Sequence, residues 1–350
     1  MEKIIVEKAG ISKILVMKPR AIGDVLLSTP VLPNLHDAFP GATIDFLVER
    51  FASPVLDNNP FLNKVIEYDA RTDSPIKLIM RLRKEKYDIT FDLFSNPRTA
   101  ILTMTSGARY RVGYPFKWRK YAYNIRVIPR GDRVHNVEFN LDALRRIGIE
   151  PTHKKPIFVL DDRSKNFASN FLRTQALSFR GYVTVNIGGG WEIKRWKRDK
   201  IVELCKLIAK GLNLPVVVLY GPAESAEAAL ISKLAGAFLA PPTSLHQMGA
   251  IMEQSLLLVT NDSGPMHIAA ALNVPTAAIF GPTSPHLQGP YGNTSEIIRK
   301  ESLDCLECNL IKCPIGNPCM TELEARTVYE RVEKLITKIL QGVRRADGII

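Results

Sequence analysis

The sequence contains no apolar segment suited to crossing a membrane as a helix. Residues 263–295 carry no Asp, Glu, Lys or Arg, but this stretch is interrupted by Pro265, Pro275, Pro282 and Pro285. A lipid-spanning helix needs about twenty consecutive, mainly apolar residues. The first twenty residues also lack the apolar core and the small-residue cleavage site of a signal peptide. We therefore expect a cytoplasmic protein.

Two common nucleotide-binding signatures are absent as well. Neither GxGxxG nor GxxxxGK[ST] occurs anywhere in the 350 residues, and these are the loops of dinucleotide-binding and P-loop proteins. An NAD-dependent enzyme would lack its fingerprint, whereas another phosphate-bearing ligand remains compatible. The sequence also lacks a helix-turn-helix, zinc-finger or RNP pattern, so it predicts no nucleic-acid partner.

Acidic residues are few relative to basic ones. The chain has 47 Lys and Arg against 35 Asp and Glu, a net charge of +12, which is typical of proteins that meet nucleic acid, an anionic membrane surface or a phosphorylated substrate. Cations are dense in residues 109–133, where they alternate with Tyr114, Trp118, Tyr121 and Tyr123. We expect this segment to dock something anionic, and a plain solvated face is the alternative. Its candidate contacts are Arg109, Arg111, Arg119 and Lys120.

Cysteine is rare, yet four of the five cysteines lie close together. Cys205 stands alone in an expected helix and is interpreted as a core residue. The others, in CLECNLIKCPIGNPC, are Cys305, Cys308, Cys313 and Cys319. Such clustering favours metal over disulfides in a reducing compartment, but the spacing is tighter than in most zinc sites. A bound metal or cluster, two disulfides and four reduced thiols in a structural loop all stay open, and a redox protein is one alternative function.

Apolar periodicity predicts two series of alternating strands and helices. In the first, strands are expected at 13–19, 42–49, 64–69 and 88–94, and helices at 24–39, 75–87 and 137–149. Residues 150–181, with one helix, join it to the second, which has strands at 182–188, 215–221, 255–261 and 275–281 and helices at 197–212, 224–236, 244–254, 267–273 and 321–340. Strands separated by helices imply parallel βαβ units. We predict an α/β protein of two Rossmann-like domains, residues 1–165 and 166–350, facing across a cleft. The helix at 321–340 is compatible with packing back on the first domain.

The first strand is followed by an unusual turn, RAIGDVLLSTP. Gly23 permits a tight turn, and Asp24 lies at the start of the next helix, where Asp is also favoured simply as an N-cap. Lys18 and Arg20 adjoin it, which the N-cap interpretation does not explain. A carboxylate at the edge of a cleft is also the simplest general base for a hydroxyl group.

The second half begins with a comparable turn, NIGGGWEIKRWKRDK. Consecutive glycines, including Gly188 and Gly189, expose backbone N–H groups. The cations that follow are Lys194, Arg195 and Lys197. Backbone donors beside cations suit phosphate oxygens. Trp191 and Trp196 are interpreted equally well as packing residues or as part of the site.

A third turn, NDSGPMH, precedes an Ala-rich helix. Ser263 and Gly264 lie at the helix N-terminus, where unpaired N–H groups and the helix dipole stabilise an anion such as a diphosphate. Asp262 can pair with a cation such as Lys194 or accept from a sugar hydroxyl, and His267 either bonds a ligand or packs. In YGPAES, Glu224 is placed to accept from ribose hydroxyls, although a first-turn Glu is favoured in any helix.

Taken together and in order, these motifs resemble glycosyltransferase family 9, the ADP-heptose:lipopolysaccharide heptosyltransferases. The resemblance rests on GDVLLSTPVL, GGGWEIKRW, YGPAE, TNDSGPMHIAAAL, FGPTSPHLQGPYG and the cysteine-rich tail, and it runs from Lys13 to about Leu340. The tail is more similar to that of heptosyltransferase II than to that of heptosyltransferase I.

The resemblance implies a GT-B fold and an inverting transfer of heptose from ADP-heptose, with no metal or other cofactor required. Asp24 matches the general base, and Lys194 matches the residue that neutralises the leaving diphosphate. Glu224 matches the position at the ribose. The implied donor contacts also include Gly188, Gly189, Asp262, Ser263, Gly264 and His267. After Gly264, relatives often carry Leu where this chain has Pro265, which lacks an N–H and removes one donor from the diphosphate contact.

The implied acceptor is the anionic inner core of lipopolysaccharide, Kdo-lipid A. Its expected contacts in the first domain are Lys18, Arg20, Arg109, Arg111, Arg119 and Lys120. The same basic segment would hold the enzyme at the anionic inner face of the cytoplasmic membrane as a peripheral protein. A glycosyltransferase of the same fold that uses another nucleotide-sugar or acceptor is the alternative.

Overall fold

The computed structural model describes residues 6, 7, 9–131 and 133–346. They form two compact units that divide between Val159 and Leu160. The predicted boundary at 165/166 falls inside α6 (Asp162–Thr174), which belongs wholly to the second unit because it packs against α9 (Leu245–Glu253). No described helix is both long and apolar enough to span a bilayer.

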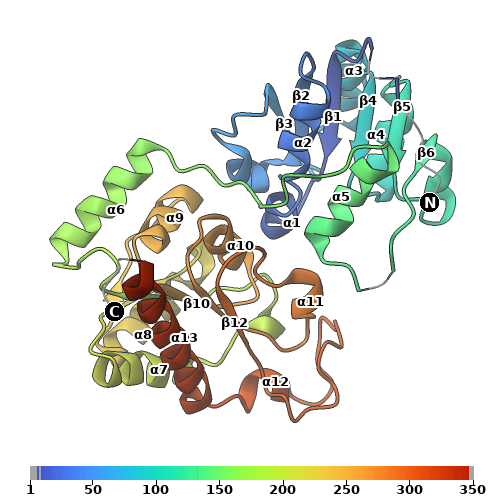
Figure 1. Ribbon diagram of the computed structural model, residues 1–350. Helices are drawn as coiled ribbons and strands as arrows, with labels where there is room; N and C mark the ends of the chain where they lie inside the picture. The colour runs from blue at the N-terminus through green and yellow to red at the C-terminus, as the bar shows by residue number, and fades with distance from the viewer. Residues whose placement is uncertain (1–5, 8, 132, 347–350) are drawn as a thin grey trace. The chain divides into compact units, whose positions relative to one another are not determined.

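The first unit is built on a parallel six-stranded sheet in the order β3-β2-β1-β4-β5-β6 (Figure 1). Its strands are β1 (Lys13–Met17), β2 (Thr43–Glu49), β3 (Lys64–Tyr68), β4 (Ile89–Asp92), β5 (Tyr110–Gly113) and β6 (Ile125–Arg126). Val16 of β1 pairs with Phe46 on one side and Phe91 on the other. All three side chains are buried, which explains why the central strands read as continuous apolar runs.

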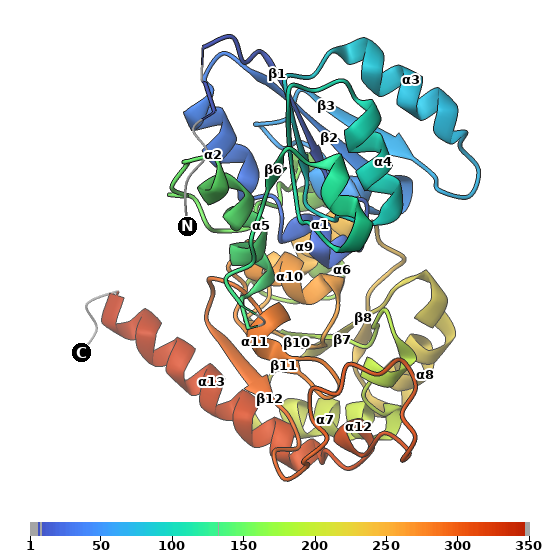
Figure 2. The ribbon, with the colours of Figure 1, turned by 90° about the vertical axis from the view of Figure 1, so that its right-hand side faces the viewer.

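Helices cover both faces of this sheet. They are α1 (Ile22–Leu26), η1 (Arg50–Leu56), α2 (Val31–Ala38), α3 (Pro75–Glu85), α4 (Pro97–Thr105), η2 (Lys117–Ala122) and α5 (Asn136–Arg146). Figure 2 shows α3 and α4 on one side of the sheet and α2 and α5 on the other. Both α3 and α4 begin at a capped proline: the Ser74 side chain accepts from the Lys77 N–H, and Asn96 and Thr99 form a reciprocal capping box.

The single helix predicted over 24–39 is wrong, because the chain breaks it into α1 and α2. Between them the Ser28 and Thr29 hydroxyls donate to the carbonyls of Val25 and Leu26 at 2.7 Å each. Pro30 follows and has no N–H with which to continue the helix. A second helix then starts with Pro30 as its N-cap.

The basic segment 109–133 contains regular structure that the sequence did not predict, namely β5, η2 and β6. Two of its four interleaved aromatic residues, Tyr114 and Tyr123, are fully buried and belong to the core. A Cβ at Gly113 would lie 2.4 Å from the Tyr123 ring, so only glycine fits there. The expectation that all four rings lie on the docking surface is therefore wrong for these two.

The second unit repeats the design with a parallel sheet in the order β12-β11-β10-β7-β8-β9. Its strands are β7 (Val183–Asn186), β8 (Val216–Leu219), β9 (Phe238–Leu239), β10 (Leu257–Asn261), β11 (Thr276–Ile279) and β12 (Ser295–Ile298). Its remaining helices are η3 (Glu192–Lys194), α7 (Arg198–Gly211), η4 (Pro222–Glu224), α8 (Ser225–Ala235), α10 (Gly264–Ala271), α11 (Pro285–Gln288), α12 (Pro318–Thr321) and α13 (Ala325–Ala346).

The terminal helix α13 begins later than predicted and packs on α7, β11 and β12 of its own unit. Its Val328, Val332 and Leu335 are buried in the core of that unit. Their spacing of three and four residues places them on one face of the helix. Contact of this helix with the first unit stays a prediction.

Candidate active site

The polar turns of the second unit meet at the carboxyl ends of its central strands. β10 pairs with β7, so that Thr260 lies opposite Asn186, although the two strands are far apart in the chain. The loop after β7 and the turn after β10 therefore start side by side. This is the place where open parallel sheets bind ligands.

Lys194 and Asp262 form an ion pair across these two turns. The Lys194 ammonium donates to Asp262 Oδ2 at 2.6 Å, and both side chains are largely buried. This contact is one of the two roles that the sequence left open for Asp262, and the structure shows it. An ammonium has three donors, so one bond to Asp262 leaves donor capacity for a phosphate oxygen.

Two further groups hold this pair in position. The Thr283 hydroxyl, which follows β11, donates to Asp262 Oδ2 at 2.7 Å. The Lys194 ammonium lies 4.7 Å from the centre of the Trp191 ring, a cation–π contact. Trp191 therefore belongs to the site, whereas Trp196 is a core residue whose indole donates to the Leu323 carbonyl at 3.0 Å.

Glu224 is buried at the end of η4 and is paired with a cation. Its Oε1 accepts from Arg195 Nη2 at 2.6 Å, and Arg195 Nε donates to the Gly189 carbonyl at 3.1 Å. Arg195 thus links the glycine turn to Glu224. A Cβ at Gly221 would lie 2.8 Å from Glu224 Oε2, so a glycine is required where the carboxylate folds back on the chain.

Two buried asparagines at the strand ends hold the glycine turn. The Asn261 side chain donates to the carbonyls of Ile187 and Gly188 and accepts from the backbone N–H of Trp196. Asn186 donates to the Gly188 carbonyl and to the Ser263 hydroxyl, both at 3.3 Å. The backbone of the glycine turn is therefore fixed by side chains of the sheet, and the Ser263 hydroxyl of the third turn is bonded to the same Asn186.

Helix α10 starts at the third turn. Ser263 is its N-cap and makes no side-chain capping bond, and Pro265 lies in the first turn, where proline fits the helix because no intrahelical N–H is needed. Gly264 begins the helix, and His267 is buried within it. The geometry predicted for an anion at a helix N-terminus is present, with one donor fewer at Pro265.

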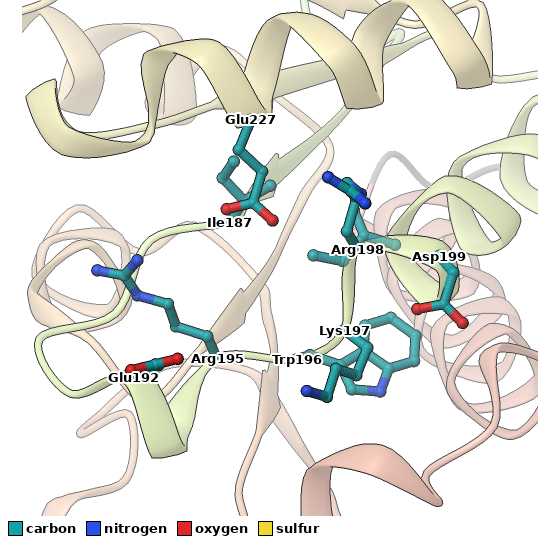
Figure 3. A pocket seen from close by; sticks show the side chains of 9 residues that line it. Ile187, Glu192, Arg195, Trp196, Lys197, Arg198, Asp199 and Glu227 are labelled. Atoms are coloured by element: carbon teal, nitrogen blue, oxygen red, sulfur yellow. The ribbon is translucent and has the colours of Figure 1, made fainter.

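A cavity of about 680 Å³ lies beside this cluster. Figure 3 shows its charged lining, with Arg195 and Glu192 on one side and Arg198 and Asp199 on the other. Its lining includes Arg195 but none of the predicted donor residues Gly188, Lys194 or Asp262. Cations and carboxylates are equally numerous in this lining, so its formal net charge is zero.

In the first unit, Asp24 occupies the third position of α1. Its Oδ2 accepts from the Ala21 N–H at 3.1 Å, and Ala21, not Asp24, is the N-cap. The carboxylate is half-buried. It therefore closes the first turn of the helix from its third position and still reaches solvent, so the N-cap interpretation is wrong and the role of general base stays a prediction.

Lys18 is buried close to Asp24 at the end of β1. Its ammonium donates to the Leu93 carbonyl at 2.9 Å and to Asn140 Oδ1 at 3.3 Å. Burial lowers the pKa of Lys18, and the negative charges of Asp24 and Asp92 oppose that shift. Asp92 is a buried carboxyl that the sequence analysis did not single out, and burial raises its pKa.

The other predicted acceptor residues have different surroundings. Arg20 is exposed, with Nε 3.9 Å from Glu49 Oε1, and Arg109 is exposed beside Glu7. The Arg111 guanidinium donates to the carbonyls of Ala108 and Ala122, so it links the backbone before β5 to the end of η2. Two more predicted contacts lie over aromatic rings of the η2 region, namely Arg119 and Lys120.

Three of the four clustered cysteines lie in a segment, 299–317, without helix or strand, and the fourth, Cys319, lies in α12. Cys305 and Cys308 are exposed, and all five cysteines of the chain are free thiols. The Asn317 N–H donates to Cys313 Sγ, and the Asn317 side chain donates to the Ile193 carbonyl beside Lys194. Among the described residues, no three His, Cys, Asp or Glu side chains are grouped as metal ligands.

Several site residues were missed by sequence reasoning. Thr283 and Asn261 were inside quoted motifs, FGPTSP and TNDSGP, but their partners depend on strand order. Each follows or ends a buried parallel strand, which is the signal that identifies such positions. Asp92 also ends a central strand and carried the same signal.

Comparison with known proteins places the chain among glycosyltransferases. A family model described as glycosyltransferase family 9 (heptosyltransferase) matches residues 76–318. Lipopolysaccharide heptosyltransferase 2 of Escherichia coli (strain K12) is 29% identical over 310 residues, which cover 82% of this chain and 88% of that protein.

Solved structures share the fold. A family 9 glycosyl transferase from Veillonella parvula DSM 2008 superimposes with a TM-score of 0.80 at 21% identity, covering 95% of this chain and 99% of that chain. An E. coli heptosyltransferase with ADP-2-deoxy-2-fluoro heptose superimposes with a TM-score of 0.71 at 22% identity, covering 92% and 99%. The prediction of an α/β fold with two Rossmann-like domains of the GT-B type is confirmed.

Proposed function

The chain belongs to glycosyltransferase family 9 and is therefore a glycosyltransferase, and we propose that it transfers a heptose from ADP-heptose to the inner core of lipopolysaccharide. The relative from E. coli K12 is named for this reaction class, and the solved E. coli heptosyltransferase holds an ADP-heptose analogue. The proposal assigns the donor to the second unit and the acceptor to the first.

The Lys194–Asp262 pair is the observation that carries the donor assignment. Its ammonium lies at the carboxyl ends of β7 and β10, beside the N-terminus of α10. When the bond between the anomeric carbon and the diphosphate oxygen breaks, negative charge develops on ADP. A fixed ammonium and backbone donors stabilise that charge without reorganising. Asp262 holds Lys194 in place for this role. Glu224 accepts hydrogen bonds from the ribose hydroxyls.

Asp24 is proposed as the general base. It accepts the proton of the acceptor hydroxyl, whose oxygen then attacks the anomeric carbon from the side opposite the leaving ADP, so that the configuration inverts. The half-buried carboxylate keeps solvent access, while the bond from the Ala21 N–H fixes its orientation. Proton transfer by a positioned group of this kind contributes about 10²–10⁴-fold to a rate.

The acceptor is proposed to be Kdo-lipid A, bound through cations of the first unit, among them Arg20, Arg109, Arg119 and Lys120. Because this acceptor is anchored in lipid, the proposal also places the enzyme at the inner face of the cytoplasmic membrane. Lys18 and Arg111 are bonded to the protein itself. In this proposal they hold the backbone of the acceptor region in place and do not bind the acceptor directly.

A panel of nucleotide-sugars tests this function. Thermal stabilisation is measured with ADP-heptose, other ADP-sugars and UDP-sugars, and transfer to Kdo-lipid A is followed by mass spectrometry. We expect ADP-heptose to stabilise the protein most and to yield a singly heptosylated product. Stabilisation and transfer with another nucleotide-sugar alone would replace this function by the same-fold alternative.

A further inference from the structure

The net positive charge of the chain equals the charge of two segments of the first unit. Residues 74–84 and 93–131 contain twelve Lys and Arg and no Asp or Glu. The whole chain has 47 basic and 35 acidic residues, a net charge of +12. Outside these two segments the chain is therefore formally neutral, and its basic character is a local property.

The two segments form adjoining elements. α3 contacts α4, and α4 contacts η2. Figure 2 shows α3 and α4 on the same side of the sheet. The cations of α3, α4 and η2 therefore lie on adjoining elements, whereas Arg130 pairs with Glu138 and Asp142 of α5.

Large apolar side chains are exposed on α3, α4 and η2, and at the residue just before η2. Their exposed fractions lie between 40 and 69%. They are Ile76 and Met80 of α3, Ile101 and Met104 of α4, and Phe116, Trp118 and Tyr121 in the η2 region. We call these residues and the cations around them the basic–apolar face. Exposed apolar residues gathered in this way mark an interaction site.

Helix α3 shows how the two kinds of side chain are arranged. Leu78 and Leu82 are buried against the unit, while Ile76 and Met80 are exposed. At 3.6 residues per turn, this second pair points almost directly away from the first. The exposed face of the helix thus carries these two apolar side chains together with the exposed cation Arg83.

The aromatic end of the face combines rings with cations. Arg119 lies 5.5 Å from the centre of the Phe116 ring, and Lys120 lies 5.2 Å from that of Tyr121. Trp and Tyr side chains of this kind favour the interface between water and lipid.

We propose that the basic–apolar face docks on the surface of an anionic lipid bilayer. The cations pair with lipid phosphates, and the exposed apolar side chains enter the boundary between headgroups and acyl chains. A nucleic-acid backbone is polar and anionic, so it offers no apolar surface for the exposed Ile and Met side chains. This disfavours nucleic acid as the partner. The choice of a bilayer rests on the proposed function, whose acceptor is lipid-anchored.

Co-sedimentation of the full chain with vesicles tests the proposal. Vesicles of phosphatidylcholine with 30 mol% phosphatidylglycerol are compared with pure phosphatidylcholine at about 0.1 M salt. We expect at least tenfold tighter binding to the anionic vesicles, weakening as salt shortens the Debye length. Trp118 fluorescence should be quenched by brominated lipids, and W118F should lose most of this quenching.

Variants separate the face from the rest of the protein. I76S/M80S and K77E/R81E should each lower vesicle binding at least tenfold. L230S/L234S, which alters two exposed apolar residues of α8, should leave it unchanged. Equal loss in this control, binding to neutral vesicles alone, or displacement by duplex DNA would overturn the proposal.

The enzyme assay distinguishes this proposal from the proposed function. With a deacylated, soluble acceptor, I76S/M80S should retain its turnover. Turnover without binding to anionic vesicles refutes the docking face and leaves the function standing. Vesicle binding without heptose transfer refutes the function and leaves the docking face standing.

Discussion

The ammonium of Lys194 lies 2.6 Å from the Oδ2 atom of Asp262, although 68 positions separate these residues in the chain. Breaking a buried pair from one side leaves an uncompensated charge, which costs about 3–5 kcal/mol. The pair therefore serves both the stability of the unit and, in the proposed mechanism, the leaving group. These two contributions can be separated.

K194M should lower the free energy of unfolding by about 3 kcal/mol and kcat/KM by about 10²–10³-fold. Adding D262N removes the stranded charge, so K194M/D262N should regain most of the stability but not the activity. Chemical denaturation and initial rates measure the two effects. Recovery of activity together with stability would show that the pair is only structural.

D24N should lower kcat by about 10²–10⁴-fold while leaving the affinity for ADP-heptose unchanged. The amide oxygen of Asn can still accept from the Ala21 N–H, so the melting temperature should hold. D24A, which also loses that bond, is the matched comparison and should be less stable. A D24N enzyme with normal turnover would remove Asp24 from the role of base.

G221A should weaken donor binding. The new Cβ would lie 2.8 Å from Glu224 Oε2, so the carboxylate must move and its bond to Arg195 is disturbed. We expect calorimetry to show a Kd for ADP-heptose about tenfold higher, as for E224Q. G41A is the control, because a Cβ there meets no atom within 4 Å. An unchanged Kd in G221A would place the ribose elsewhere.

Thiol reactivity should follow burial. Cys305 and Cys308 are exposed and should react with a disulfide reagent at pH 8 within minutes. Burial raises the pKa of Cys205 to about 12 and, together with the charges of the neighbouring cysteines, that of Cys319 to about 11. These two should react only after unfolding. Fewer than two fast thiols would indicate a metal or disulfides in this segment.

Glu85 should make stability sensitive to acid. Bonds from Lys13 and Lys64 lower the pKa of its carboxyl from 4.5 to about 2. A pKa lowered by folding contributes stability above pH 4.5, and this contribution is lost as pH falls towards 2. The lysines are about 40% exposed, so the screened contribution is about 1 kcal/mol. E85Q should cost this amount at pH 7 and much less at pH 2, as measured by urea unfolding. An equal cost at both pH values would contradict the ionic origin.

Much of the fold was predictable because buried parallel strands are continuous apolar runs separated by helices. Runs such as 215–221 and 255–261 contain β8 and β10, and their alternation with helices indicated two Rossmann-like domains. β5 and β6 were missed because they are short and lie in a basic, aromatic segment. The break between α1 and α2 depends on hydroxyl bonds from Ser28 and Thr29 that periodicity does not register.

By itself the sequence determined the order of strands and helices, the three polar turns at strand ends and the location of the excess positive charge. These are local properties of composition and spacing. Only the tertiary structure decided which turns meet, because β10 lies between β11 and β7 in the sheet, although β7 is distant from it in the chain. That strand order brings Asp262 to Lys194 and Thr283. Packing likewise placed Lys18 and Tyr123 in the interior and left Trp118 and Tyr121 exposed, a division that depends on which side of each backbone faces the sheet.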